Sequence, residues 1–205
     1  MRCFVLSKLV IGLTGPTGAG KSTVAQAFER AGCEIIDADL VARQAVTDEK
    51  CLAALKAEFG NDIVQDGVLN RRLLAQRAFS SEKGAAKLNS ITHPVIMGMV
   101  KNQIASIKTS GAKAVVLDAA LLFESGADSL CDTTVAVTAP VEIRLNRIMN
   151  RDGISKELAE ARIGAQKGNS YYNERARYRL DGVMNRDDIQ TAVNRLLEQI
   201  IGDYT

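Results

Sequence analysis

Residues 12–23, GLTGPTGAGKST, constrain the fold of this 205-residue chain more than any other segment. Almost all of these residues are small, and they directly follow the apolar run KLVI. Within the segment, residues 15–22 match GxxxxGK[ST] at every fixed position. The pattern predicts a buried strand over residues 8–14, a phosphate-binding loop, and a helix that buries Val24, Ala25, Ala27 and Phe28 and stops at Gly32.

The composition of this loop suits a polyphosphate ligand. Small residues leave backbone N–H groups open to phosphate oxygens, and the N-terminus of the next helix adds a partial positive charge. Lys21 is expected to reach the β- and γ-phosphates, and the Ser22 hydroxyl to bind Mg²⁺. An ordinary glycine-rich turn is the alternative. The residues expected to bind ATP are Gly15, Pro16, Thr17, Gly18, Ala19, Gly20, Lys21, Ser22 and Thr23.

Apolar runs alternate with helical periods along the chain, which predicts βα units and a parallel sheet. We expect further strands at residues 33–39, 114–118 and 133–137, and Pro140 in the first turn of the following helix. Residues 40–111 have helical periodicity throughout, so they predict a helical insertion in which Pro94 starts or kinks a helix. The last helix should bury one apolar stripe, formed by Ile189, Val193, Leu196, Leu197, Ile200 and Ile201.

Composition indicates one globular domain with room for an inserted subdomain, since 46% of residues are hydrophobic and 24% charged. The net charge of +2 is too small to attract nucleic acid or a membrane surface in bulk. No run approaches the ~18 apolar residues of a membrane span. Cys3, Cys33, Cys51 and Cys131 lie far apart without a CxxC pair. We therefore expect packing cysteines and a reducing, cytoplasmic compartment.

A P-loop alone does not distinguish a kinase from a GTPase or a motor. The chain contains no NKxD and no DxxG motif, which argues against a GTPase. Asp37 and Asp39 are expected at the carboxyl end of the second strand, where open parallel sheets bind ligands. A carboxylate there is suited to accept a proton from an attacking hydroxyl. Asp39 is equally suited to cap the following helix, and both interpretations stay open.

Basic residues are concentrated in residues 144–179, which contain nine Lys or Arg and four Asp or Glu. Arg144, Arg147 and Arg151 are three and four residues apart and therefore share one face of a helix. We interpret this face as an arginine lid over the phosphates, with a solvated basic face as the alternative. Asp118, which ends an apolar strand, is a candidate ligand of Mg²⁺. His93 precedes Pro94 and fits a hydrogen-bonding residue at a helix start better than a catalyst.

These motifs, taken in order, resemble the dephospho-coenzyme A kinase family over nearly the whole chain. The shared segments are the P-loop with its leading Thr14, IIDADLVAR (35–43), FG (59–60), DGVLNRRLL (66–74), LNSITHP (88–94), LLFE (121–124) and RLNRIMNRDGIS (144–155). The resemblance implies an α/β P-loop kinase fold in three layers with a parallel five-stranded sheet. Its nucleotide-binding core would comprise residues 1–39, 112–139 and 180–205, with a helical CoA-substrate domain at 40–111 and a lid at 140–179.

The resemblance also implies a reaction, the ATP-dependent phosphorylation of the ribose 3′-hydroxyl of dephospho-CoA to give CoA and ADP. This is the last step of coenzyme A biosynthesis, and it requires Mg²⁺. The implied protein is a cytoplasmic monomer or small homo-oligomer without a nucleic-acid or membrane partner. Another P-loop small-molecule or nucleoside monophosphate kinase is the alternative within this class. A P-loop ATPase without an acceptor is the alternative from a different class.

Carried over by position, the family's catalytic base falls on Asp39, beside Asp37, and its P-loop lysine on Lys21. Its phosphate-binding arginines fall on Arg147 and Arg151. The residues implied to bind the substrate are Thr14, Asp37, Asp39, Arg71, His93 and Gln166. Three segments depart from the family pattern: Pro16-Thr17 replaces Gly-Ile, Ala120 replaces a proline, and LDGVMNRDD around Asn185 replaces AD.VI.N.

Overall fold

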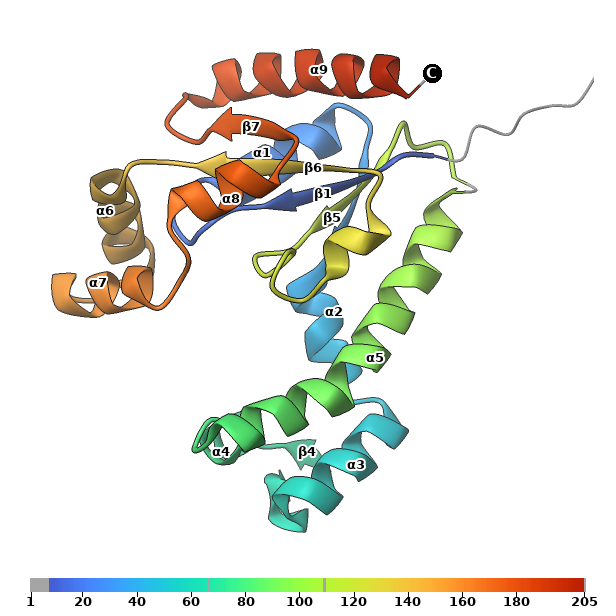
Figure 1. Ribbon diagram of the computed structural model, residues 1–205, viewed down its shortest axis with the longest axis vertical. Coiled ribbons are helices and arrows are strands. Elements are labelled where there is room, and N and C mark those ends of the chain that lie inside the picture. The colour runs from blue at the N-terminus through green and yellow to red at the C-terminus, as the bar shows by residue number, and fades with distance from the viewer. Residues whose placement is uncertain (1–7, 66, 109, 205) are drawn as a thin grey trace, which may run out of the picture. The chain divides into compact units, whose positions relative to one another are not determined.

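The computed structural model describes residues 8–65, 67–108 and 110–204, which form two compact units (Figure 1). Ala38–Gln103 is one unit, and the chain on both sides of it forms the other. None of the helices in the described part of the chain has the length and apolar character needed to span a bilayer.

The larger unit is built on a five-stranded sheet with the order β2-β5-β1-β6-β7. Every neighbouring pair of strands is parallel, which confirms the expected sheet. The strands are β1 (Val10–Thr14), β2 (Glu34–Asp37), β5 (Val115–Asp118), β6 (Thr133–Thr138) and β7 (Tyr178–Asp181). All five residues of the central strand β1 are buried, as expected of a strand covered on both faces.

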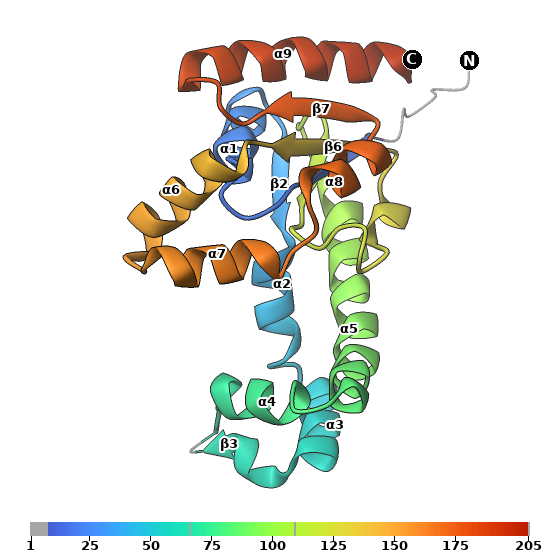
Figure 2. The ribbon, with the colours of Figure 1, turned by 60° about the vertical axis from the view of Figure 1, so that its left-hand side comes forward.

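Helices cover both faces of this sheet, which produces three layers (Figures 1 and 2). On one face α1 (Lys21–Arg30) and α9 (Arg186–Asp203) pack against each other and bury the expected apolar residues, except that Ile201 is only half-buried. On the other face α8 (Asn169–Arg175) places Tyr172 against Ala136 of β6. In the sequence, α6 (Val141–Asp152) and α7 (Lys156–Gly164) come between β6 and α8. A short 3₁₀ helix, η2 (Ala127–Leu130), precedes β6.

The smaller unit is mostly helical, with a core formed by Cys51, Leu55, Phe59, Ile63, Leu74 and Ala78. Its elements are α2 (Ala38–Ala45), α3 (Glu49–Phe59), η1 (Asn61–Ile63), β3 (Val64–Gln65), β4 (Val68–Leu69), α4 (Arg71–Ala78) and α5 (Glu82–Lys108), the last of which crosses the unit boundary. The prediction of helix throughout this segment is wrong at the antiparallel hairpin of β3 and β4. The Asp-Gly dipeptide between these strands is a hairpin signal, and Gly67 has a φ of 78°.

Element boundaries correct three further expectations. Strand β2 ends at Asp37 and α2 begins at Ala38, so Asp39 lies in the first turn of α2 and is not its N-cap residue. Pro94 lies inside α5, so His93 is in mid-helix and not at a helix start. Pro140 is the N-cap of α6, one residue before the first turn. In each case a helix was predicted, but the structure places its first residue at a different position.

The described cysteines are packing residues, as expected. Cys33 and Cys51 are buried in the two cores, and all three described cysteines are free thiols. Burial raises the pKa of Cys33 to about 11 and that of Cys131 to about 12, so both thiols stay protonated at neutral pH. Cys3 lies outside the described residues.

Candidate functional site

The GxxxxGK[ST] segment forms a loop between the carboxyl end of β1 and the start of α1. Gly15, Gly18 and Gly20 have φ angles of 150°, 77° and 101°, which side chains rarely adopt. At Gly18 a Cβ atom would also lie 2.8 Å from the backbone oxygen of Arg144. Glycine is therefore required at the middle of this loop both by its backbone conformation and by its close contact with α6.

The first turn of α1 is open to an anion. Gly20 is the N-cap residue, and none of the side chains in the described part of the chain caps this helix. A helix start of this kind has free N–H donors and the positive end of the helix dipole. Together with a loop lined by backbone rather than by bulky side chains, this fits a polyphosphate.

One carboxylate pairs with the loop lysine, and a second lies beside that carboxylate in the sheet. Lys21 forms an ion pair with Asp118, and their side chains are only 17% and 14% exposed. Asp118 ends β5, and the parallel register places Asp37 of β2 directly beside it. Over the residues described, no group of three or more His, Cys, Asp or Glu residues is arranged to hold a metal. The candidate metal ligands are the side-chain oxygen atoms of Ser22 in α1 and of Asp118. Such oxygen ligands suit Mg²⁺, which is usually held by few protein side chains in addition to phosphate oxygens.

Side chains from α6 contact the phosphate-binding loop. Arg147 donates from Nη1 to the carbonyl oxygen of Gly18 (3.2 Å) and from Nη2 to that of Gly182 (2.8 Å). Arg144 donates from Nε to the carbonyl oxygen of Thr17 (2.9 Å). Two of the three arginines predicted to share a helix face are thus in direct contact with the loop.

The third arginine of that face has different partners. Arg151 is exposed and pairs with its neighbour Asp152, which also pairs with Arg162 of α7. Hydrogen bonds from Arg151 lower the pKa of Asp152 below its ordinary value, and Arg162 adds to this shift. The proposed phosphate-binding role of Arg151 stays a prediction.

Two residues that contact the loop had no individual role predicted from the sequence: Arg144, named only as part of the basic helix face, and Gly182. Arg144 is 1% exposed although it is charged; burial lowers its pKa, and the nearby Tyr172 opposes that shift. Gly182 follows β7, and a Cβ atom there would lie 1.7 Å from the carbonyl oxygen of Ala19. The only signals in the sequence were the spacing of Arg144 from Arg147 and a glycine at the end of a strand.

The residues that the family resemblance implies for binding the substrate are divided between the two units. In the larger unit, Thr14 is buried and donates from Oγ1 to the carbonyl oxygen of Ala120 (3.4 Å). Gln166, also in this unit, follows α7 and accepts the backbone N–H of Thr17 with its Oε1 (2.8 Å). The resemblance implies a substrate contact for Gln166, and that role stays a prediction.

Asp37 also belongs to the larger unit, whereas Asp39, Arg71 and His93 belong to the smaller unit. Arg71 is the first residue of α4 and donates to the carbonyl oxygen of Arg43 (2.9 Å). His93 has its Nε2 buried in α5 without a hydrogen-bond partner among the described residues. The roles of these residues, and those of residues 40–111 and 140–179 as substrate domain and lid, stay predictions.

Asn185, which follows β7 in the sequence, stabilises the start of α9. It is the N-cap residue of α9, and its side-chain oxygen accepts the N–H groups of Asp187 and Asp188 (both 3.0 Å). An Asn at this position is among the most favourable N-cap residues. The departure of this segment from the family pattern thus leaves a well-capped final helix.

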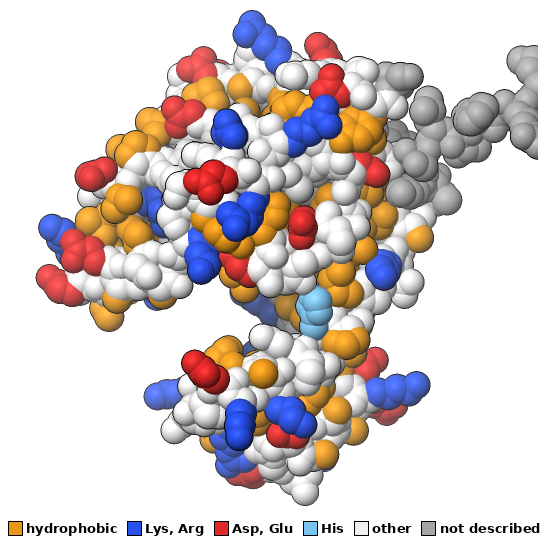
Figure 3. Space-filling model, in the orientation of Figure 1, with side chains coloured by type: hydrophobic (Ala, Val, Ile, Leu, Met, Phe, Trp, Pro, Cys, Tyr) orange, Lys and Arg blue, Asp and Glu red, His pale blue; other side chains and the backbone are white. Residues whose placement is uncertain are grey.

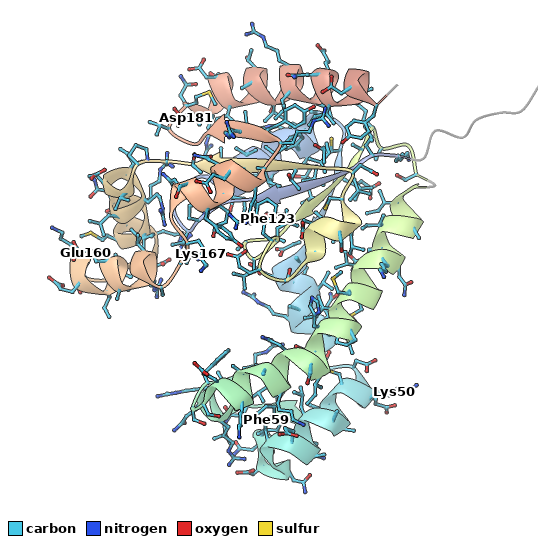
Figure 4. All side chains as sticks on the ribbon, viewed as in Figure 1. Lys50, Phe59, Phe123, Glu160, Lys167 and Asp181 are labelled. Atoms are coloured by element: carbon cyan, nitrogen blue, oxygen red, sulfur yellow. The ribbon has the colours of Figure 1, made fainter. Side chains whose placement is uncertain are left out.

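An aromatic cluster joins Phe123 to Tyr171 and Tyr172 of α8, and two cations lie over the Tyr171 ring; Phe123 and Lys167 are labelled in Figure 4. The rings of Phe123 and Tyr171 meet edge to face with centroids 6.3 Å apart. Arg175 lies over the Tyr171 ring at 3.9 Å, and Lys167 at 5.7 Å. Some of the basic side chains in residues 144–179 therefore contact aromatic rings of the protein itself. On the face drawn in Figure 3, acidic and basic side chains are interspersed, in agreement with the small net charge.

Comparison with known proteins gives consistent results. A family model described as dephospho-CoA kinase matches residues 9–190. The dephospho-CoA kinase of Corynebacterium diphtheriae is 38% identical over 192 residues, covering 93% of this chain and 96% of that protein. The crystal structure of TT1252 from Thermus thermophilus is 32% identical, with a TM-score of 0.81 over 94% of this chain and 97% of its own. The dephospho-CoA kinase from Campylobacter jejuni is 23% identical and shares the fold, with a TM-score of 0.71 and coverage of 96% and 98%.

Proposed function

Because the chain belongs to the dephospho-CoA kinase family, we propose that it transfers the γ-phosphoryl group of ATP to the ribose 3′-hydroxyl of dephospho-CoA. The products are CoA and ADP. The observation that carries this proposal is the phosphate-binding loop, in a chain whose likeness to the family covers 93% of its length. A cytoplasmic location and a monomeric or small oligomeric state are part of the same proposal.

On the nucleotide side, the backbone N–H groups of the loop and the first turn of α1 bind the phosphates, and Lys21 balances their charge. To bind the phosphate oxygens, Lys21 must first break its ion pair with Asp118. Arg147 contributes planar donors next to the loop, where its guanidinium already lies. Ser22 and Asp118 would hold Mg²⁺, which when bound neutralises charge on the phosphate oxygens.

On the acceptor side, Asp39 accepts or orients the proton of the 3′-hydroxyl, and Asp37 supports it. Asp37 is at the carboxyl end of β2 next to Asp118, and Asp39 follows two residues later in the first turn of α2. A phosphoryl transfer of this type needs little beyond alignment of the two oxygens and stabilisation of charge. Thr14, Arg71, His93 and Gln166 are proposed to orient the acceptor, and Arg151 to bind phosphate.

An acceptor screen tests the proposal. ADP release is measured with Mg²⁺ and ATP in water alone, with AMP, with shikimate, and with dephospho-CoA, and the product is identified by mass spectrometry. Only dephospho-CoA should accelerate ADP release strongly and yield CoA. Equal acceleration by AMP or shikimate would indicate another small-molecule kinase, and turnover that no acceptor changes would indicate an ATPase. Either result refutes the proposal.

A further inference from the structure

Both backbone groups of Thr17, at the middle of the phosphate-binding loop, are held by side chains from outside the loop. The carbonyl oxygen accepts from Nε of Arg144 at 2.9 Å, and the N–H donates to Oε1 of Gln166 at 2.8 Å. Both side chains come from the segment that follows β6. The orientation of this part of the loop therefore depends on residues more than a hundred positions away in the sequence.

Peptide planarity passes this constraint on to the next residue. The Thr17 carbonyl and the Gly18 N–H belong to one planar trans peptide unit, so they point in opposite directions. A Cβ atom at Gly18 would meet the Arg144 backbone at 2.8 Å (oxygen) and 3.0 Å (Cα), which shows how closely α6 lies against the loop. When Arg144 holds the carbonyl toward α6, the Gly18 N–H points away from α6. A backbone N–H turned outward from a loop can bind an anion. The N–H groups of the neighbouring Thr17 and Ala19 donate instead to Oε1 of Gln166 and to the carbonyl oxygen of Pro16.

The burial of Arg144 indicates that this contact is more than a surface interaction. Its exposed fraction is 1%, and Tyr172 next to it is equally buried. The Nη2 atom is buried without a hydrogen-bond partner among residues 8–204 as described. A buried guanidinium with an unused donor is costly, and replacing it by an apolar residue is often tolerated in other proteins. What the arginine offers here is an Nε donor at the Thr17 carbonyl.

We propose that Arg144 is a positioning residue for the nucleotide. By holding the Thr17 carbonyl against α6, it presents the Gly18 N–H to the phosphates of ATP. This inference rests on the proposed function, since it takes ATP as the ligand. Arg144 acts through the loop backbone and does not touch the transferred group, so its contribution belongs to nucleotide binding and not to the chemical step.

Two substitutions distinguish the effect of the Arg144 hydrogen-bond donor from the effect of its positive charge. Counting from Cβ, Nε2 of glutamine occupies the same position along the side chain as Nε of arginine. Arg144→Gln therefore keeps a donor for the Thr17 carbonyl while it removes the charge and the unused Nη2. Arg144→Met keeps a stem of the same length without any donor. Arg195→Met, which removes an exposed arginine from α9, is the matched control.

The measurement is the dissociation constant of ATP by titration calorimetry without acceptor, followed by kcat and both KM values. Losing one hydrogen bond that preorganises the loop should weaken ATP binding about tenfold or more in Arg144→Met. Binding by Arg144→Gln should stay within about threefold of the wild type. In both variants kcat and the KM for dephospho-CoA should change little, and Arg195→Met should match the wild type throughout.

Several outcomes would overturn the inference. Equal ATP affinity in Arg144→Met and wild type, even with a lower melting temperature, would leave Arg144 a purely structural residue. If Arg144→Met does not fold, Arg144→Lys replaces it, because its Nζ lies one bond beyond the Nε position. Wild-type affinity in Arg144→Lys together with a tenfold loss in Arg144→Gln would show that charge, and not the donor, matters. Failure of the wild type itself to bind ATP would instead refute the proposed function.

Discussion

Gly182 offers a direct test of how β7 supports the phosphate-binding loop. A Cβ atom at this position would lie 1.7 Å from the carbonyl oxygen of Ala19 and 2.9 Å from its carbonyl carbon. Non-bonded carbon and oxygen atoms need at least about 3 Å, so Gly182→Ala must separate the two backbones by more than about 1 Å. Arg147, which donates to the carbonyl oxygen of Gly182, would be displaced with it.

The expected effects follow from this displacement. Overpacking of a buried contact costs about 1–3 kcal/mol of the free energy of unfolding. A misplacement of about 1 Å in a phosphate-positioning loop lowers kcat/KM by about 10²-fold. The variant should therefore bind ATP more weakly and melt at a lower temperature than the wild type.

Steady-state kinetics, ATP titration and urea unfolding check the two effects. Gly202→Ala is the matched control, because Gly202 lies in α9 and a Cβ atom there meets nothing within 4 Å. In a helix this change should raise stability by up to ~1 kcal/mol and leave activity unchanged. A Gly182→Ala enzyme with wild-type kcat/KM and stability would show that the loop does not depend on this contact.

Two further predictions concern residues assigned to the reaction. Asp39→Asn should lower kcat by about 10²-fold or more with folding intact, as expected for a lost general base, and Asp37→Asn should cost less. Loss of thermal stability with normal turnover in Asp39→Asn would instead give this residue a structural role. Arg147→Ala should lower kcat by about 10³-fold, and Arg147→Lys should recover only part of it. Since Arg147 also binds Gly18, we expect a several-fold rise in the KM for ATP; wild-type kinetics of both variants at low and high salt would exclude Arg147 from the mechanism.

The parts of this protein that the sequence determined are those encoded by contiguous residues. The phosphate-binding loop needs glycine at fixed spacings and a strand and helix on either side, and all of this lies within about twenty neighbouring positions. The buried stripe of α9 follows in the same way from helical period. The hairpin of β3 and β4 was missed because each strand has only two residues, too few to interrupt a helical pattern.

Tertiary structure decided which distant residues serve the loop. The sequence placed Arg144, Arg147 and Arg151 on one helix face, but only packing buries Arg144 against Thr17 and leaves Arg151 exposed beside Asp152. Likewise, the neighbourhood of Asp37 and Asp118 depends on the pairing of β2 with β5. Sequence periodicity describes how side chains are arranged around one element. Contacts between elements depend on register and packing, which are set by free energies summed over the whole core.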